Sequence, residues 1–436
     1  MGQTGKVTDV KATMTFVPVG SHNQRLQIYP PICGLRRLHI QLCFLAGFLV
    51  LLLIARTLSN MRVIFVQYHA ASDTDGELVV LPKQFAVSRG AYCIDGSAPG
   101  YYIRRGKSPN VNGWILHLPG GSWCSSVEEC YSRSFTELGS SVEAPMSRAF
   151  GGILSSNEVE NPDFHKWNMV DFLYCDGGFF TGNRSSDIRH HSKILYLRGF
   201  QVFNAVIDYL LEHTELKYAD QVILAGTSSG GVAATVNADY LRRKLTSVKS
   251  LHLVVDAGLF LDQPNSAGEH VIASVFKNVY YLHNILGATS ISECSMRLAD
   301  EEQWKCLLPS FFYKHLFTPV FFVNSLYDTW YMNHVLSVTC PVSQCKAKDI
   351  EVLENHKNLV LSDIHPVVSS VHDGLYLTSC PVHSMLVNSR FNTKFHEDGV
   401  ELRKAFSKWF FHKVPNVTFV DNMKYTQVTA LCVLGA

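Results

Sequence analysis

Residues 221–245 read QVILAGTSSGGVAATVNADYLRRKL, and this stretch decides the fold. Its first five residues form an apolar, β-rich run that stops at Gly226. The alanine-rich segment that follows, residues 232–245, predicts a helix. Between the two lies the pattern G-x-S-x-G, with Ser228 at its centre. A strand, a sharp turn carrying a serine and then a helix are together typical of a nucleophile elbow.

The two outer glycines of this pattern have a physical function. The turn is so sharp that a side chain at Gly226 or Gly230 would collide with neighbouring backbone. Ser228 would then adopt a strained conformation that pushes its hydroxyl into a cleft, where the start of the helix favours negative charge. The pattern alone is weak, and an ordinary Gly/Ser-rich turn is the alternative. The strand before it and the helix after it favour the elbow.

The remainder of the body alternates β-rich runs with helical segments. The strand candidates are residues 114–118, 169–174, 251–255, 319–323 and 375–378. The helix candidates are residues 197–211 and 406–412. Strands and helices in alternation predict an α/β fold with a mostly parallel sheet that is flanked by helices on both faces.

A serine hydroxyl needs a base to act as a nucleophile, and the base needs an orienting carboxylate. After an elbow of this kind, the acid and then the histidine follow along the chain. Asp328 follows the second strand after the elbow and is favoured over Asp256, which ends the first strand and is expected to cap the turn at 257–258. His383 follows the last candidate strand. Three other histidines compete with it: His365, His372 and His396.

Backbone N–H groups near Ser228 would have to hold the oxyanion of such a reaction. One should come from Ser229, and the others from the Gly-rich turn 119–123 (PGGSW) after the first strand. The adjacent His190 and His191, with Asp187 nearby, form a candidate metal cluster. Adjacent histidines on a loop rarely converge on one ion without help, so we expect no metal and no organic cofactor.

Composition narrows the class of protein. Lys plus Arg is 38 and Asp plus Glu is 37, which argues against a nucleic-acid partner because such proteins carry a basic excess. The chain is 47% hydrophobic and 17% charged, which excludes a disordered protein. The chain has 12 cysteines and no C-x-x-C pair. The spacings of Cys124 with Cys130, and of Cys340 with Cys345, predict short disulfide loops in an oxidising compartment.

An uncharged segment near the N-terminus predicts a membrane anchor. Residues 38–55 (LHIQLCFLAGFLVLLLIA) are just long enough to span a bilayer, and Arg36 and Arg37 precede them. The N-terminal flank, which carries these basic residues, should stay in the cytosol. The alternatives are a cleaved signal peptide and a buried core helix. Sequons at Asn183 and Asn416 agree with lumenal exposure. The predicted parts are a cytosolic tail, one transmembrane helix, a stem and the body: residues 1–37, 38–55, 56–91 and 92–436.

Several further motifs occur in a specific order along the body. They are CIDGS at 93–97, GGSWC at 120–124, ENPDF at 160–164, YCDGG at 174–178, the elbow, DAGLFLD at 256–262, YDTW at 327–330, and Ser379-Cys380 with His383. With these motifs the chain resembles the plant pectin acetylesterase family, whose animal relatives are the Notum carboxylesterases. The resemblance extends from about residue 92 to residue 412.

The resemblance implies an α/β-hydrolase-like fold. It also implies which residues form the catalytic triad, the oxyanion hole and the disulfides. By position, Ser228, Asp328 and His383 match the catalytic triad. The implied oxyanion donors are Gly121, Ser122 and Ser229. The implied disulfides join Cys93 to Cys175 and Cys124 to Cys130. Spacing alone suggests two more, Cys294 with Cys306 and Cys340 with Cys345.

The chain departs from the family pattern beside two triad positions. Thr227 and Ser229 replace a cysteine and an alanine of the plant elbow, and Val382 and Ser384-Met385 replace the usual neighbours of the histidine. The departures leave the reaction class in place and put the acyl or sugar preference in doubt. Family members are usually secreted, whereas this chain carries a candidate anchor.

The sequence therefore predicts a serine esterase that removes O-acetyl groups from cell-wall polysaccharide, above all pectin. Its expected partners are an acetylated polysaccharide and a membrane that holds the N-terminal helix. It would be a type II protein of the secretory pathway, in the Golgi or at the cell surface, or would reach the cell wall if the N-terminal segment is cleaved. Two alternatives stay open: a Notum-type esterase of lipid-modified protein, and an inactive glycan-binding or scaffold protein.

Overall fold

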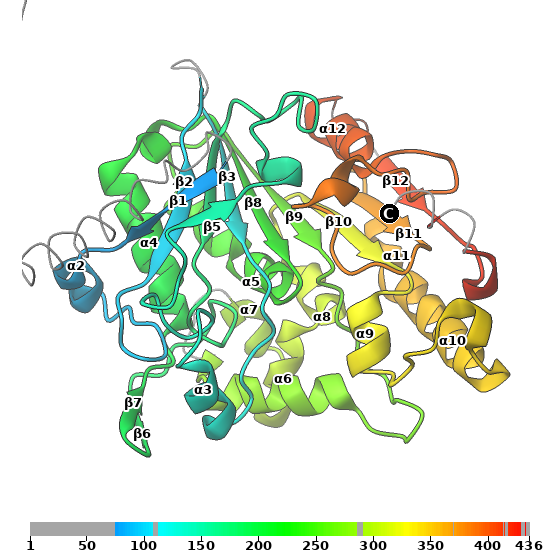
Figure 1. The fold of residues 1–436 in the computed structure, drawn as a ribbon, viewed down its shortest axis with the longest axis horizontal. Helices are drawn as coiled ribbons and strands as arrows, with labels where there is room; N and C mark the ends of the chain where they lie inside the picture. The colour runs from blue at the N-terminus through cyan, green and yellow to red at the C-terminus, as the bar shows by residue number, and fades with distance from the viewer. Residues whose placement is uncertain are drawn as a thin grey trace, which may run out of the picture. The chain divides into compact units, whose positions relative to one another are not determined.

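The structure is a computed structural model that describes residues 75–107, 112–285, 291–368, 370–412, 414, 417–428 and 432. Its centre is a ten-stranded sheet with the order β12-β11-β10-β9-β8-β3-β5-β2-β1-β4 (Figure 1). The strands are β1 Asp75–Val80, β2 Gly100–Arg104, β3 Gly113–Leu118, β4 Ser147–Ala149, β5 Asn168–Phe172, β8 Gln221–Thr227, β9 Ser250–Asp256, β10 Val320–Ser325, β11 Gly374–Thr378 and β12 Val417–Val420. A separate two-stranded hairpin pairs β6 Ile188–His190 with β7 Lys193–Leu195.

The strand pairing confirms the predicted mostly parallel sheet. Every neighbouring pair from β12 to β5 is parallel. The pairs β5·β2, β2·β1 and β1·β4 are antiparallel. Each of the predicted strands and helices overlaps an observed one, and the elbow segment forms β8 followed by a helix. The parallel part of the sheet therefore lies around β8, at the place that the sequence indicates.

Helices cover both faces of the sheet. They are α2 Lys83–Ser88, α3 Val127–Arg133, α4 Gly199–His213, α5 Ser229–Lys244, α6 Val271–Leu282, α7 Ser292–Ser295, α8 Pro309–Phe312, α9 Thr329–His334, α10 Ala347–Asp363, α11 His365–Val368 and α12 Leu402–His412. Alternate residues of β8 face different layers, because successive side chains of a strand point to opposite faces. Val222 and Leu224 join the core that includes α4 and α5. Ile223 and Ala225 join the core that includes α12.

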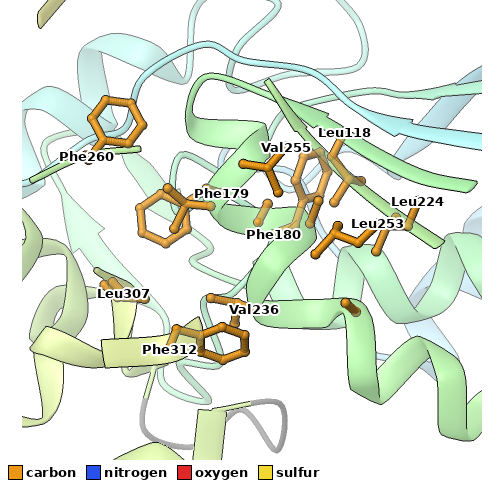
Figure 2. Close-up of a cluster of buried hydrophobic side chains, with 14 of the residues drawn as sticks. Leu118, Phe179, Phe180, Leu224, Val236, Leu253, Val255, Phe260, Leu307 and Phe312 are labelled. Atoms are coloured by element: carbon orange, nitrogen blue, oxygen red, sulfur yellow. The ribbon is translucent and has the colours of Figure 1, made fainter. Parts of the chain in front are cut away.

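The larger core is visible in Figure 2. Leu118, Leu224 and Leu253, from three neighbouring strands, lie near Phe180, and all four side chains are fully buried. Val236 of α5 packs in the same core, which extends to Phe312 of α8. Burial of this apolar surface is the main force that holds the helix layer on the sheet.

The predicted stem needs a correction. We expected residues 56–91 to lie outside the body, yet Asp75–Val80 forms β1, and α2 follows directly. β1 pairs with β2 on one side and with β4 on the other. Neither partner is adjacent to β1 in the sequence, and the local sequence DGELVV shows no clear strand pattern, so the pairing is a tertiary effect.

Some predictions fall outside the described residues. These are the tail 1–37, the transmembrane helix 38–55, residues 56–74 of the stem, and Asn416. Within the described part of the chain, no helix has both the length and the apolar character needed to cross a bilayer.

The described residues contain five disulfide bonds. Two are the pairs implied by the resemblance, Cys93–Cys175 and Cys124–Cys130. Two more are the pairs suggested by spacing, Cys294–Cys306 and Cys340–Cys345. The fifth, Cys380–Cys432, was not expected, and it ties the segment before His383 to the C-terminal region.

Candidate active site

Four residues singled out from the sequence meet at one edge of the sheet. The parallel strands β8, β9, β10 and β11 are neighbours, so their carboxyl ends lie at the same edge (Figure 1). Ser228 follows β8, Asp256 ends β9, Asp328 follows β10, and His383 lies beyond β11. In open sheets of this kind, ligand sites form outside the carboxyl ends of the strands.

The turn after β8 has the geometry of a strained elbow. Ser228 has φ 57° and ψ −127°, a region that non-glycine residues rarely occupy. A Cβ at Gly226 would lie 2.0 Å from the Gly230 carbonyl oxygen, and one at Gly230 would lie 2.0 Å from the Leu118 carbonyl oxygen. The turn therefore requires both glycines, as the sequence predicts. The hydroxyl-bearing Ser228 stands at the start of α5.

His383 and Asp328 form a hydrogen-bonded pair. The His383 Nδ1 lies 2.9 Å from Asp328 Oδ1 and 2.8 Å from Asp328 Oδ2. Asp328 is held in turn, because its Oδ1 accepts the backbone N–H of Tyr331 at 3.0 Å in the first turn of α9. Burial lowers the pKa of His383, but the hydrogen bond and charge of Asp328 outweigh it, so the pKa is raised above its usual 6.5. A carboxylate bonded to Nδ1 leaves Nε2 to exchange protons.

Asp256 has a different role from the expected one. We predicted a cap on the turn at 257–258, but its Oδ2 accepts the backbone N–H groups of Met385 and Leu386 at 2.8 and 2.9 Å. Its carbonyl oxygen accepts the Ser228 N–H at 2.8 Å. One buried residue thus joins the elbow to the loop that carries His383. Burial raises the pKa of Asp256 to about 6, although the two N–H groups counteract it.

The competing histidines lie elsewhere. His365 begins α11 and His372 precedes β11, so both belong to the opposite end of that strand from His383. His396 is buried and its Nε2 lies 3.2 Å from Asp421 Oδ1. These positions leave His383 as the histidine beside Asp328.

The turn after β3 approaches the elbow closely. A Cβ at Gly120 would lie 2.7 Å from the Ser228 Cβ and 3.4 Å from its Oγ. Arg133 of α3 donates to the Gly121 carbonyl oxygen at 2.9 Å, and the Tyr174 hydroxyl donates to the Ser122 carbonyl oxygen at 2.6 Å. A trans peptide directs its N–H away from its C=O. Holding the Gly121 carbonyl therefore fixes the opposite direction of the Ser122 N–H.

A buried polar chain behind the elbow was missed by sequence reasoning. The Thr227 Oγ1 lies 3.0 Å from His117 Nε2, and His117 Nδ1 lies 2.7 Å from Asp171 Oδ1. Arg148 of β4 donates to the other Asp171 oxygen at 2.9 Å. Two features of the sequence could have indicated this network. Thr227 replaces the cysteine of the plant elbow, and His117 interrupts an apolar strand. The network connects the elbow to the antiparallel strands.

Aromatic side chains pack against one another between the β3 turn and α9. The Trp123 ring lies 5.2 Å from Phe276, 5.5 Å from Phe260 and 5.7 Å from Trp330, between ring centroids. Trp330 is in turn 6.2 Å from the His383 ring. An aromatic cluster therefore extends from the candidate oxyanion turn to the candidate base.

The remaining predicted site residues lie outside this edge. Asp187 pairs with Arg198 at 3.0 Å, so it does not join His190 and His191 as we had considered. Asn183 is half-buried and its side chain contacts Gln201. The disulfide Cys124–Cys130 braces α3, whose Arg133 holds the candidate oxyanion turn.

Comparisons with known proteins identify a matching family, similar sequences and a similar fold. The family model described as Pectinacetylesterase matches residues 70–432. Pectin acetylesterase 5 of Arabidopsis thaliana is 33% identical over 77% of this chain and 81% of its own length. Palmitoleoyl-protein carboxylesterase NOTUM of Schmidtea mediterranea is 29% identical over 72% of this chain and 61% of its own length. The solved Wnt deacylase Notum from Drosophila superposes with a TM-score of 0.71 at 24% identity, covering 82% of this chain and 99% of that one, which shows a shared fold.

Proposed function

Because the chain belongs to the pectinacetylesterase family and is thus a carboxylesterase, we propose that it removes O-acetyl groups from cell-wall polysaccharide, above all from pectin. The observation that carries the proposal is the hydrogen-bonded pair His383–Asp328 at the same sheet edge as the strained Ser228. Nucleophile, base and orienting acid are the three parts that acyl transfer by a serine requires.

In the first half of the proposed reaction, the Ser228 Oγ attacks the acetyl carbonyl carbon. The His383 Nε2 takes the hydroxyl proton as the new C–O bond forms, and Asp328 stabilises the imidazolium. The negative charge moves to the carbonyl oxygen, where the N–H groups of Gly121, Ser122 and Ser229 would hold it. As the tetrahedral intermediate collapses, His383 returns the proton to the departing sugar oxygen, and the acetyl group stays on Ser228.

In the second half, a water molecule replaces the sugar. His383 takes one proton from the water as its oxygen attacks the acetyl-enzyme, and a second oxyanion forms at the same N–H groups. Collapse of that intermediate releases acetic acid, which ionises to acetate in water, and His383 returns its proton to Ser228. The atoms and protons balance with no further reactant, so each step can be carried by side chains and backbone of this chain.

The relatives leave the acyl group open, since some are named for acetyl esters of pectin and others for palmitoleoyl-protein esters. The aromatic cluster of Trp123, Trp330 and Phe260 supports the second candidate substrate, a lipid ester of protein. An apolar surface beside the candidate site could hold a fatty acyl chain. The identity to the relatives named pectin acetylesterases, 30–33%, exceeds the 26–29% to those named carboxylesterases, which favours the acetyl ester.

We also propose that the enzyme works in the secretory pathway or outside the cell, held by residues 38–55 unless that segment is removed. Five disulfide bonds in the described residues support an oxidising compartment. N-glycosylation at Asn183 and Asn416 belongs to the same proposal.

The test is acetate release from acetylated pectin and from acetylated xylan by the full chain and by Ser228→Ala. We expect release from pectin by the wild type, and a fall by about 10³-fold or more in the variant. A parallel assay with acetyl and octanoyl p-nitrophenyl esters separates the two candidates. A strong preference for octanoyl would replace the polysaccharide substrate with a lipid ester. No hydrolysis of any ester by folded protein would support a glycan-binding or scaffold role instead.

A further inference from the structure

Two adjacent histidines lie at the tip of the β6–β7 hairpin, outside the central sheet (Figure 1). His190 is the last residue of β6, and His191 has a left-handed backbone with φ 48°. Consecutive side chains of an extended strand point to opposite sides, but the left-handed residue breaks that alternation. The two rings lie 4.2 Å apart between centroids, on the same side of the hairpin.

A carboxylate from another element reaches both rings. Glu128 lies in the first turn of α3, and its Oε2 is 2.8 Å from His190 Nε2 and 3.8 Å from His191 Nε2. One ligand atom from each of the three side chains lies within 4.8 Å of the other two. Atoms bound to a tetrahedral zinc ion at about 2.0–2.1 Å are about 3.3 Å apart. The two distances from the Glu128 oxygen lie on either side of that value, so this oxygen already stands near the spacing of zinc ligands from both nitrogens.

We propose that Glu128, His190 and His191 form a binding site for a divalent transition-metal ion of the zinc type. Two imidazole nitrogens and one carboxylate oxygen suit zinc and its neighbours, whereas calcium and magnesium take oxygen ligands. Three protein ligands leave a fourth position for water. The ligands come from α3 and from the hairpin, so the ion would join two segments that are far apart in the chain.

The surroundings support a site that is formed before the ion arrives. The Tyr131 ring packs against His190 and His191 at 5.3 and 5.0 Å between centroids. The disulfide Cys124–Cys130 anchors α3. All three ligand side chains are reached by solvent, with exposures of 27% for His190, 60% for His191 and 65% for Glu128, so an ion can enter.

This site is separate from the proposed ester chemistry. One connection runs through α3, where Arg133 donates to the carbonyl oxygens of Gly121 and Trp123 in the candidate oxyanion turn. The ion would act as a brace that holds the hairpin against α3. We therefore expect it to raise the thermal stability of the protein, and the inference holds whichever ester the enzyme cleaves.

The test is calorimetric titration of zinc chloride into the full chain, prepared without a polyhistidine tag. We expect one zinc ion per chain at this site. Glu128→Gln and His190→Ala should each weaken binding by more than about tenfold, since even outer partners of metal ligands contribute about 10–100-fold. Zinc should raise the melting temperature of the wild type by about 2–5 °C and leave that of both variants unchanged.

His270→Ala is the matched control, because His270 is a half-exposed histidine that pairs with a carboxylate, that of Asp262 at 3.1 Å, and this pair has no second histidine. It should bind zinc like the wild type. Equal zinc affinity in Glu128→Gln and in the wild type would overturn the proposal. So would calcium binding as tight as zinc binding, or the absence of zinc binding to the folded wild type.

Discussion

At the scale of single residues, the candidate base depends on one carboxylate. Asp328 contacts Nδ1 of His383 with both oxygens, which sets the tautomer and favours the charged imidazole. The base must be neutral to accept a proton from Ser228, so kcat/KM should rise with pH through the pKa of His383. That pKa lies above 6.5, because Asp328 outweighs the effect of burial.

We predict that Asp328→Asn lowers kcat by about 10³–10⁴-fold, because the imidazole loses its orienting and stabilising charge. The same change removes the main cause that raises the pKa of His383, so the acid limb of the pH profile should move to lower pH. The measurement is kcat/KM for p-nitrophenyl acetate from pH 5 to pH 9. Asp187→Asn, which alters an exposed ion pair with Arg198, is the control and should keep the wild-type profile. An unchanged profile in Asp328→Asn would remove Asp328 from the triad.

At the scale of elements, the site is assembled from the ends of strands and the loops that follow them. β9 connects the elbow to the loop that carries His383. Its last residue, Asp256, accepts a hydrogen bond from the elbow through its carbonyl oxygen and two from the His383 loop through its carboxylate. The loop itself has little regular structure between Ser379 and Met385. A small displacement of a catalytic group can cost about 10²-fold in rate, so these two bonds matter for positioning.

We predict that Asp256→Ala lowers kcat by about 10²-fold with little change in KM, because the His383 loop loses both acceptor bonds. Asp256→Asn keeps one oxygen that can accept from Met385 and Leu386, so it should recover most of the rate. The measurements are kcat and KM together with circular dichroism, which reports whether each variant is folded. Equal loss in both variants would indicate that the negative charge of Asp256 acts on His383 directly. Wild-type kcat in folded Asp256→Ala would show that the loop holds its position without this carboxylate.

At the scale of the whole molecule, disulfides connect parts of the fold that lie far apart in sequence. Cys93 and Cys175 are 82 residues apart, and their bond joins the segment before β2 to the end of β5. Cys340 and Cys345 are 5 residues apart and close a short loop. A cross-link stabilises mainly by restricting the unfolded chain, and the effect grows with the logarithm of the loop length.

We predict that Cys93→Ser with Cys175→Ser lowers the free energy of unfolding by about 4 kcal/mol, because an 82-residue loop is released. The matched pair Cys340→Ser with Cys345→Ser should cost only about 2 kcal/mol. The measurement is the urea midpoint of each double variant without reductant. A larger loss in the short-loop variant would show that chain entropy does not govern the stability of this fold.

The amino-acid sequence by itself determined the elbow, the mostly parallel sheet and the order of the candidate triad. The elbow could be predicted because its cause is local: an apolar run, two glycines and a helix lie within a few residues of Ser228. Asp328 and His383 followed from their places after strands, since parallel strands bring such places to one edge. The strand β1 could not be predicted, because its backbone partners belong to β2 and β4 and its own pattern is weak.

Only the tertiary structure decided which polar groups meet. Asp256 binds a loop that lies 129 residues further along the chain, and Thr227 is 110 residues from its partner His117. Glu128 reaches His190 across 62 residues, whereas the nearby Asp187 pairs with Arg198. Hydrogen bonds and ion pairs of this kind depend on distances of a few ångströms between side chains. Sequence spacing does not specify those distances until the sheet and its helices have packed.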